Sequence, residues 1–138
     1  MIDTTSIMTL ALSAALSGLI GYERETHGKG AGLRTHMLVG IGSCLLAMLD
    51  RHLMALYPSA DVGRISAQVV SGIGFLGAGT ILRGKNTVKG LTTAAGVWAA
   101  SAVGLSVGMG MAAIATLSTV LLIACLKSAV WVKRRPKK

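Results

Sequence analysis

Glycine recurs inside one long apolar stretch of the sequence, residues 65–82. The four glycines of this stretch are Gly72, Gly74, Gly77 and Gly79. In water, each glycine in a helix interior costs about 1 kcal/mol relative to alanine. Inside a bilayer the backbone must satisfy its own hydrogen bonds, and small residues let two helices approach closely. We therefore predict that residues 65–82 form a transmembrane helix built for close helix contact, with a short loop behind it.

The composition favours a membrane protein over a soluble helical bundle with a large core. Of 138 residues, 52% are hydrophobic and only 14% are charged, and the mean hydropathy is +0.65. Five acidic residues are too few to solvate the surface of an ordinary soluble domain. The net charge of +9 raises nucleic acid as a partner, but the basic residues lie between apolar stretches and at the C-terminus. We expect the lipid bilayer, and not nucleic acid, as the partner.

Five apolar stretches predict an all-α fold, a polytopic membrane bundle of about five glycine-rich transmembrane helices. They are residues 6–22, 33–49, 65–82, 91–108 and 111–132. Stretches of this length suit a hydrocarbon core of about 30 Å. A single helix over residues 91–132 would be about 60 Å long, so two antiparallel helices with a turn near residues 108–110 fit better. Between the second and third stretches, residues 53–57 are expected to form an interfacial turn of helix before Pro58.

The fourth stretch carries small residues at every fourth position, a spacing that places them along one helix face. They are Gly96, Ala100, Gly104 and Gly108. We interpret them as a strip for helix packing, although general glycine richness is an alternative.

The distribution of basic residues predicts the orientation. Three groups contain 12 of the 14 Lys and Arg residues: Arg24, Lys29 and Arg34; Arg83, Lys85 and Lys89; Lys127, Lys133, Arg134, Arg135, Lys137 and Lys138. Five spans with the N-terminus outside and the C-terminus in the cytoplasm place all three groups inside. A four-span arrangement would divide them between the two sides. We expect a transmembrane domain at 1–132 and a basic cytoplasmic tail at 133–138.

Candidate functional residues gather at the predicted cytoplasmic ends of the first two spans. Glu23 and Arg24 end the first span, and Arg34, Thr35 and His36 begin the second. An ion pair here would hold the two spans in register. Alternatively, the groups form a functional polar site at the mouth of the bundle, since ionisable groups within membranes are often functional. His36 could then serve as a sensor of acid or magnesium stress.

Further candidates lie in the third and fourth spans. Arg64 and Gln68 open the third span, where Gln68 is expected to bond to another helix or line a wet cavity. Arg83 belongs to the basic loop, and Thr92 could cap the fourth helix. We predict no catalytic residues, because no nucleophile stands at a recognisable spacing from a base. We predict no metal site and no cofactor, since no span has an acidic residue at its centre.

Four motifs together resemble the MgtC/SapB family of bacterial membrane proteins. They are GLIGYERE at 18–25, AGLRTHMLVGIG at 31–42, RISAQVVSGIGFLGAGTILR at 64–83 and VKGLTTAAGVWAASAVG at 88–104. The resemblance implies a multi-pass inner-membrane protein linked to growth at low magnesium and, in one subgroup, to restraint of the F-type ATP synthase. Virulence members of the family add a cytoplasmic C-terminal domain. They carry Asn and Cys at the positions of Thr92 and Ala99, where this chain differs.

These observations favour a non-enzymatic inner-membrane protein of bacteria. We expect it to support adaptation to magnesium limitation or to envelope or acid stress. It would act through helix contacts, either by self-association or with another membrane protein. The alternative is an oligomeric transporter or channel for magnesium or another small solute, with Gln68, Arg34 and Glu23 lining the path.

Overall fold

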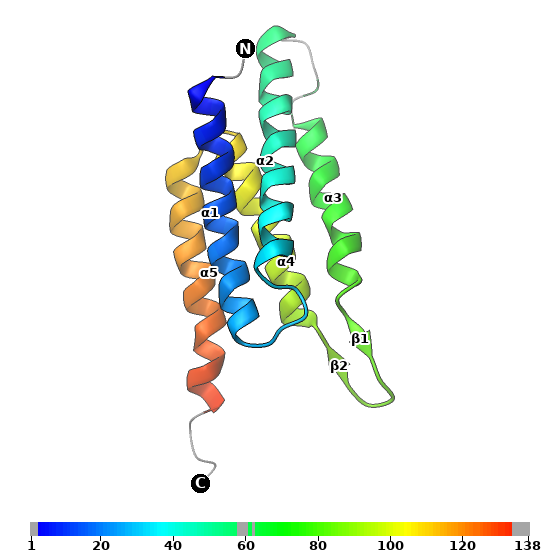
Figure 1. Cartoon of the computed structure of the whole chain (residues 1–138). Coiled ribbons are helices and arrows are strands. Elements are labelled where there is room, and N and C mark those ends of the chain that lie inside the picture. Colours follow the sequence, from blue (N-terminus) through cyan, green and yellow to red (C-terminus); the bar gives the residue numbers. More distant parts are fainter. Residues whose placement is uncertain (1–2, 58–60, 62, 134–138) are drawn as a thin grey trace.

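The protein forms a bundle of five helices with one short β-hairpin, shown by a computed structural model that describes residues 3–57, 61 and 63–133 (Figure 1). The elements are α1 (Thr4–Thr26), α2 (Leu33–Leu56), α3 (Arg64–Ala78), β1 (Leu82–Arg83), β2 (Val88–Lys89), α4 (Leu91–Gly108) and α5 (Ala112–Lys133). The prediction of an all-α membrane bundle with five helices is confirmed.

Three of the described helices, α1, α2 and α4, are long and apolar enough to cross a membrane. The segment Ala112–Ser128 of α5 is also apolar. With 15 residues, α3 measures about 22 Å, which is less than the thickness of a typical hydrocarbon core.

Consecutive helices run in opposite directions, so the chain ends of different elements meet at two poles of the bundle. The end of α1, the start of α2, the β-hairpin, the start of α4 and the end of α5 all lie at the lower pole in Figure 1. The start of α1, the end of α2 and the start of α3 lie at the upper pole. Segments that are far apart in the sequence, such as the α1–α2 loop and the hairpin, therefore lie at the same end of the bundle.

The centre of the bundle is the contact of α2 with α1 and α4. At Gly104 of α4, a Cβ atom would overlap the carbonyl oxygen of Gly40 in α2, and at Gly108 it would overlap that of Cys44. Both glycines belong to the small-residue strip recognised in the sequence. The two backbones thus approach as closely as glycine permits, which a larger side chain would prevent.

Serine hydroxyls complete this contact inside the bundle. Ser13 of α1 donates a hydrogen bond to the carbonyl oxygen of Gly40 over 2.9 Å, and Ser17 donates to the carbonyl oxygen of Ser13 over 2.6 Å. Ser43 of α2 and Ser101 of α4 share a buried hydrogen bond of 2.8 Å. Small hydroxyl residues therefore fill the space between helices and satisfy their own polarity there, as membrane interiors require.

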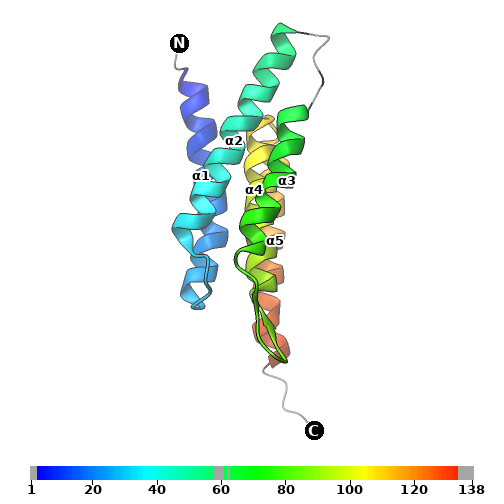
Figure 2. The same cartoon turned by 90° about the vertical axis from the view of Figure 1, so that its right-hand side faces the viewer.

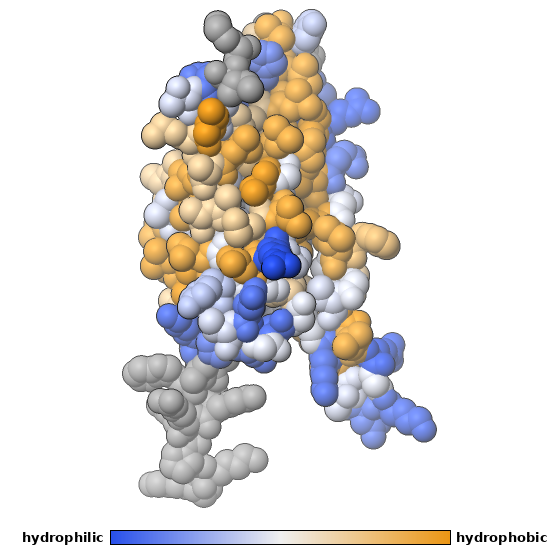
Figure 3. Space-filling model, in the orientation of Figure 1, coloured by the Kyte–Doolittle hydropathy of each residue, from blue (hydrophilic) through white to orange (hydrophobic). Residues whose placement is uncertain are grey.

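The outer surface of the helices is apolar. Exposed side chains include Met8 on α1, Leu38 on α2, Phe75 on α3 and Leu117 on α5. In Figure 3, hydrophobic groups cover the middle of the face that is shown, and hydrophilic groups gather at its lower end. A polar solvent would not favour this surface, whereas hydrocarbon would.

The third predicted span ends earlier than expected. The prediction placed its end at residue 82, but α3 ends at Ala78 and a turn follows, in which the Thr80 hydroxyl donates to the carbonyl oxygen of Gly77 over 2.8 Å. The expected simple loop is an antiparallel hairpin, with Leu82 opposite Lys89 and Arg83 opposite Val88. It extends beyond the start of α4 in both views (Figure 2).

Gly90 closes the base of this hairpin. Its φ angle of +91° favours glycine, and a Cβ atom there would overlap the carbonyl oxygen of Thr80. The two ends of the hairpin are therefore held against each other, immediately before α4 begins.

The other helix boundaries differ less from the predicted spans. Residues 53–56, within the turn of helix predicted before Pro58, are helical and form the last turn of α2, which continues without a break to Leu56. The turn predicted near residues 108–110 is present, with Gly110 at a φ angle of +86°. Lys133 is the last residue of α5, and the rest of the predicted tail, 134–138, lies outside the described residues.

The close approach of α2 and α4 gives a test of the core. Gly104→Ala should lower the free energy of unfolding by about 1–3 kcal/mol, because the new methyl group meets the Gly40 backbone. Gly42→Ala is a matched control, since a Cβ there meets no atom within 4 Å. It should leave the stability unchanged or raise it by up to about 1 kcal/mol. Denaturant titration of both variants in detergent measures the difference, and equal stabilities would contradict this packing.

Candidate functional site

Glu23 and Arg24 form a buried ion pair at the end of α1. The exposed fraction of each side chain is about 5%, and the Arg24 Nε atom donates to the Glu23 Oε2 atom. Both residues lie in the last turn of α1. Gly18 and Gly21, in the preceding turns, pack against α2, and this close approach of the two helices buries the pair. Arg24 also holds the following loop, since its carbonyl oxygen accepts a hydrogen bond of 3.0 Å from the Lys29 backbone N–H.

The second carboxylate oxygen of Glu23 is a buried acceptor. Among the described residues, Oε1 has no hydrogen-bond partner. The nearby His27 Nδ1 lies 3.2 Å from Oε1 but 2.8 Å from the backbone oxygen of Glu23, and a single N–H directed to the backbone leaves Oε1 unsatisfied. One side of this carboxylate is therefore free to accept a hydrogen bond.

His36 is fully buried one turn inside α2. Its Nδ1 atom lies 2.9 Å from the carbonyl oxygen of Gly32. A carbonyl oxygen only accepts, so Nδ1 carries the hydrogen and Nε2 of the neutral ring is a bare acceptor. Within the described part of the chain Nε2 has no partner, and it faces α4, where a Cβ atom at Gly96 would lie 3.3 Å away. The imidazole thus occupies the space that Gly96 leaves open.

The structure places the other candidates apart from these three residues. Arg34 and Thr35 begin α2 beside His36, but both are exposed. Gln68 lies on α3, where it lines an apolar pocket of 590 Å³ between α2 and α3. Arg83 is exposed on β1. Thr92 is exposed near the start of α4, which has no side-chain cap.

Arg64 lies at the opposite pole, at the start of α3. It lines a pocket of 240 Å³ together with Asp50 and Asp61. Asp50 is buried, and its Oδ2 atom accepts hydrogen bonds from the backbone N–H of Ser66 over 3.1 Å and from its hydroxyl over 2.7 Å. The carboxylate therefore caps α3 from the preceding helix.

Two acidic residues with structural roles were missed in the sequence. Asp50 is one, and Glu25 is the other, since its Oε2 atom accepts a hydrogen bond of 2.7 Å from the backbone N–H of Leu33 at the start of α2. Both helices begin after a glycine, Gly32 or Gly63, that offers no side-chain cap. An acidic residue at the end of the preceding helix, followed by an uncapped helix start, is the signal that could have found them.

The predicted packing glycines fall into two classes. Gly77, Gly96, Gly104 and Gly108 are buried in helix contacts, as is Ala100. In contrast, Gly72 and Gly74 are exposed, and a Cβ atom at either would meet nothing within 4 Å. Gly79 is exposed and meets only the backbone of its own helix. The outward glycines of α3 thus have no role in packing inside the described chain.

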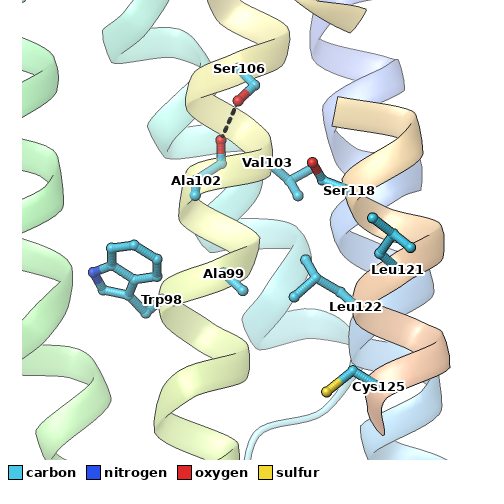
Figure 4. Close-up of a pocket in the computed structure, with 9 residues that line it drawn as sticks. All are labelled: Trp98, Ala99, Ala102, Val103, Ser106, Ser118, Leu121, Leu122 and Cys125. Carbon is cyan, nitrogen blue, oxygen red and sulfur yellow. Dashed lines mark hydrogen bonds between the residues drawn. The ribbon is translucent and has the colours of Figure 1, made fainter. Parts of the chain in front are cut away.

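A pocket of 440 Å³ also lies between α4 and α5. Trp98, Ala99 and Cys125 are among its lining residues, and Leu121 and Leu122 project towards it from α5 (Figure 4). Its walls are mostly apolar, and the Ser106 hydroxyl bonds to the Ala102 backbone instead of facing a ligand. The pocket has the character of a lipid-facing crevice.

Comparison with known proteins identifies the family to which this bundle belongs. The model of the MgtC family matches residues 10–135. The chain belongs to the MgtC family. The match includes the α1–α2 end with Glu23, Arg24 and His36, and it extends over all five helices. Together with the three long apolar helices, it makes this chain a multi-pass membrane protein.

Several curated proteins are similar to this MgtC family member. "Putative magnesium transporter YhiD" of Escherichia coli (strain K12) is 46% identical over 76% of this chain and 51% of its own length. Protein SapB of Bacillus subtilis (strain 168) is 34% identical over 97% of this chain and 60% of its own length. Protein MgtC of Brucella abortus (strain 2308) is 42% identical over 83% of this chain and 47% of its own length. This chain thus spans about half the length of these relatives, and no solved structure matches it.

The ion pair at the end of α1 gives a test of the site. Arg24→Gln should cost about 3–5 kcal/mol of stability, because it leaves the Glu23 carboxylate buried without a counter-charge. The double variant Glu23→Gln/Arg24→Gln should recover most of this loss, since no charge remains buried. Unfolding of the three proteins in detergent compares them. A double variant as unstable as Arg24→Gln would show that the pair itself is not the cause.

Proposed function

We propose that this protein is a non-enzymatic protein of a bacterial inner membrane that acts through contacts with another membrane protein or a second copy of itself. Its role would be adaptation to magnesium limitation or to envelope or acid stress. The link to magnesium is supported by the relative from Escherichia coli, whose name is "Putative magnesium transporter YhiD".

The observation that carries this proposal is the outward face of α3. Ile73 and Gly77 turn towards the bundle and are buried, and Gly77 approaches the Ala94 backbone of α4. Gly74 is exposed, and a Cβ atom there would meet nothing within 4 Å, whereas Gly72 lines the pocket between α2 and α3. In a bilayer, a glycine on a helix surface stabilises the protein only where another helix comes close, because hydrocarbon chains pack equally well on larger residues. A contact of α3 with another membrane helix would use the exposed position of Gly74.

The interior of the protomer argues against a path through it. The backbone contact of Gly40 with Gly104 and that of Cys44 with Gly108 close the space between α2 and α4. Among the described residues, no group of three or more His, Cys, Asp or Glu side chains could hold a metal ion. Both features support contact between helices, more than conduction, as the mode of action.

The outward glycines test this proposal directly. Gly74→Leu should leave the free energy of unfolding of the isolated protein unchanged or higher, since nothing lies within 4 Å of a Cβ there. It should nevertheless abolish growth support at limiting magnesium in a strain that depends on the protein, because the partner helix is pushed away. Ala11→Leu is the matched control, a small exposed residue on α1. Full growth support by Gly74→Leu would remove α3 as the contact face.

A transporter or channel is the second candidate function, and one observation favours it. The Glu23 Oε1 and His36 Nε2 atoms are buried acceptors without a described partner at the same pole of the bundle. Unsatisfied polar atoms at membrane depth are costly, and they occur where a solute or a proton passes. An oligomer could then complete a path that one protomer does not provide.

Ion flux separates the two candidates. The purified protein in liposomes should give no magnesium entry above protein-free liposomes, at neutral or mildly acidic pH, when an internal dye is the indicator. Entry that is present in the wild type and lost in Glu23→Gln would establish the transporter instead. Entry that is equal in both proteins would exclude Glu23 from the path.

A further inference from the structure

The β-hairpin is strongly basic and makes no ion pair within the described chain. Arg83, Lys85 and Lys89 are all exposed, and residues 79–90 include no acidic side chain. The ion pairs seen among described residues both involve Glu23, which is buried in α1. Three positive charges therefore stand on one short segment with no carboxylate to neutralise them.

The register of the hairpin mixes these charges with exposed apolar side chains. Leu82 is 68% exposed and stands opposite Lys89, while Val88 is 53% exposed and stands opposite Arg83. Directly opposed residues project to the same face of a hairpin. Each face thus presents one apolar and one basic side chain, the combination that spans the boundary between acyl chains and headgroups.

The place of the hairpin in the fold fixes its depth. It connects α3 to α4, and the contact of Gly90 with the Thr80 carbonyl holds its base at the ends of these helices. It extends from the lower pole, the pole at which hydrophilic groups gather (Figures 1 and 3). We therefore expect a segment tied so closely to two membrane helices to lie at the headgroup level.

We propose that this hairpin, residues 81–90, is a docking surface for the headgroups of anionic phospholipids. Arg83, Lys85 and Lys89 contact lipid phosphates, and Leu82 and Val88 enter the outer edge of the hydrocarbon. Anionic lipid is the occupant because of the charge complementarity and because the exposed leucine and valine need an apolar neighbour at this depth. An acidic soluble protein would match the charges but leave these two side chains in water. The inference is independent of the proposed contact at α3.

Hydrogen exchange of the hairpin in nanodiscs tests this inference. The full chain is placed in nanodiscs of phosphatidylcholine alone, or of equal parts of phosphatidylcholine and phosphatidylglycerol. We expect exchange of residues 81–90 to be about tenfold slower with phosphatidylglycerol, since each basic residue near an anionic surface adds favourable binding. Equal exchange in the two lipids would overturn the proposal.

Two triple variants with the same change of charge locate the effect. Arg83→Gln/Lys85→Gln/Lys89→Gln should lose the slowing by phosphatidylglycerol. Lys29→Gln/Arg34→Gln/Lys127→Gln removes three exposed charges outside the hairpin and should keep it. If both variants lost the slowing, its cause would be the net positive charge of the whole protein, which would contradict a site on the hairpin.

Two further measurements test what binds. Leu82→Ser/Val88→Ser should reduce the slowing although all three charges remain, and an unchanged slowing would contradict insertion into the hydrocarbon. Inorganic phosphate added to phosphatidylcholine nanodiscs should not slow exchange. If inorganic phosphate slowed the exchange of residues 81–90 to the same extent as phosphatidylglycerol, the surface would be an anion site and not a lipid contact.

Discussion

The bundle depends on the direct approach of two helix backbones, α2 and α4. Without glycine at 104 and 108, the carbonyl oxygens of Gly40 and Cys44 could not lie where they do. The same approach leaves room for the Ser43–Ser101 hydrogen bond and for His36 opposite Gly96. In a membrane, where apolar contact with lipid is as favourable as apolar contact with protein, such close packing supplies the dispersion energy that holds helices together. The buried residues Ser43, Ser101 and His36 are arranged around that contact.

The acidic residues show how few charges this fold can accommodate and how they are used. Asp3 caps α1 through the backbone N–H of Thr5, Glu25 caps α2 and Asp50 caps α3. Glu23 neutralises Arg24. Four of the five acidic residues of the chain are thus engaged with its own helix ends or its own arginine.

The sequence predicts the number of helices well because apolar length and helix-breaking glycines determine it locally. The predicted span 91–108 agrees with α4, and the spacing of Gly96, Gly104 and Gly108 predicts a face that the structure buries. The ends of α3 and α2 were not predicted. The end of α3 depends on the distant contact of Gly90 with the Thr80 carbonyl, and α2 continues to Leu56 although the predicted span stops at residue 49. For the site, the proximity of Glu23, Arg24 and His36 to one pole followed from the loop length. The Nε2 atom of His36 without a partner could not be predicted from the sequence. It results from the packing of α4 against α2, which places Gly96, a residue without a side chain, opposite the imidazole.

The contact of Gly90 with the Thr80 carbonyl at the base of the hairpin makes the spacing of α3 and α4 independent of the length of the loop that connects them. Because Thr80 and Gly90 are in contact, this contact fixes the distance between the end of α3 and the start of α4, and the strands and the tip do not. The tip, where the Gly84 backbone N–H bonds to the Thr87 carbonyl oxygen over 2.8 Å, can therefore change in length or sequence without moving either helix. A tip of different length or sequence would keep the same membrane bundle and present different groups at the membrane surface.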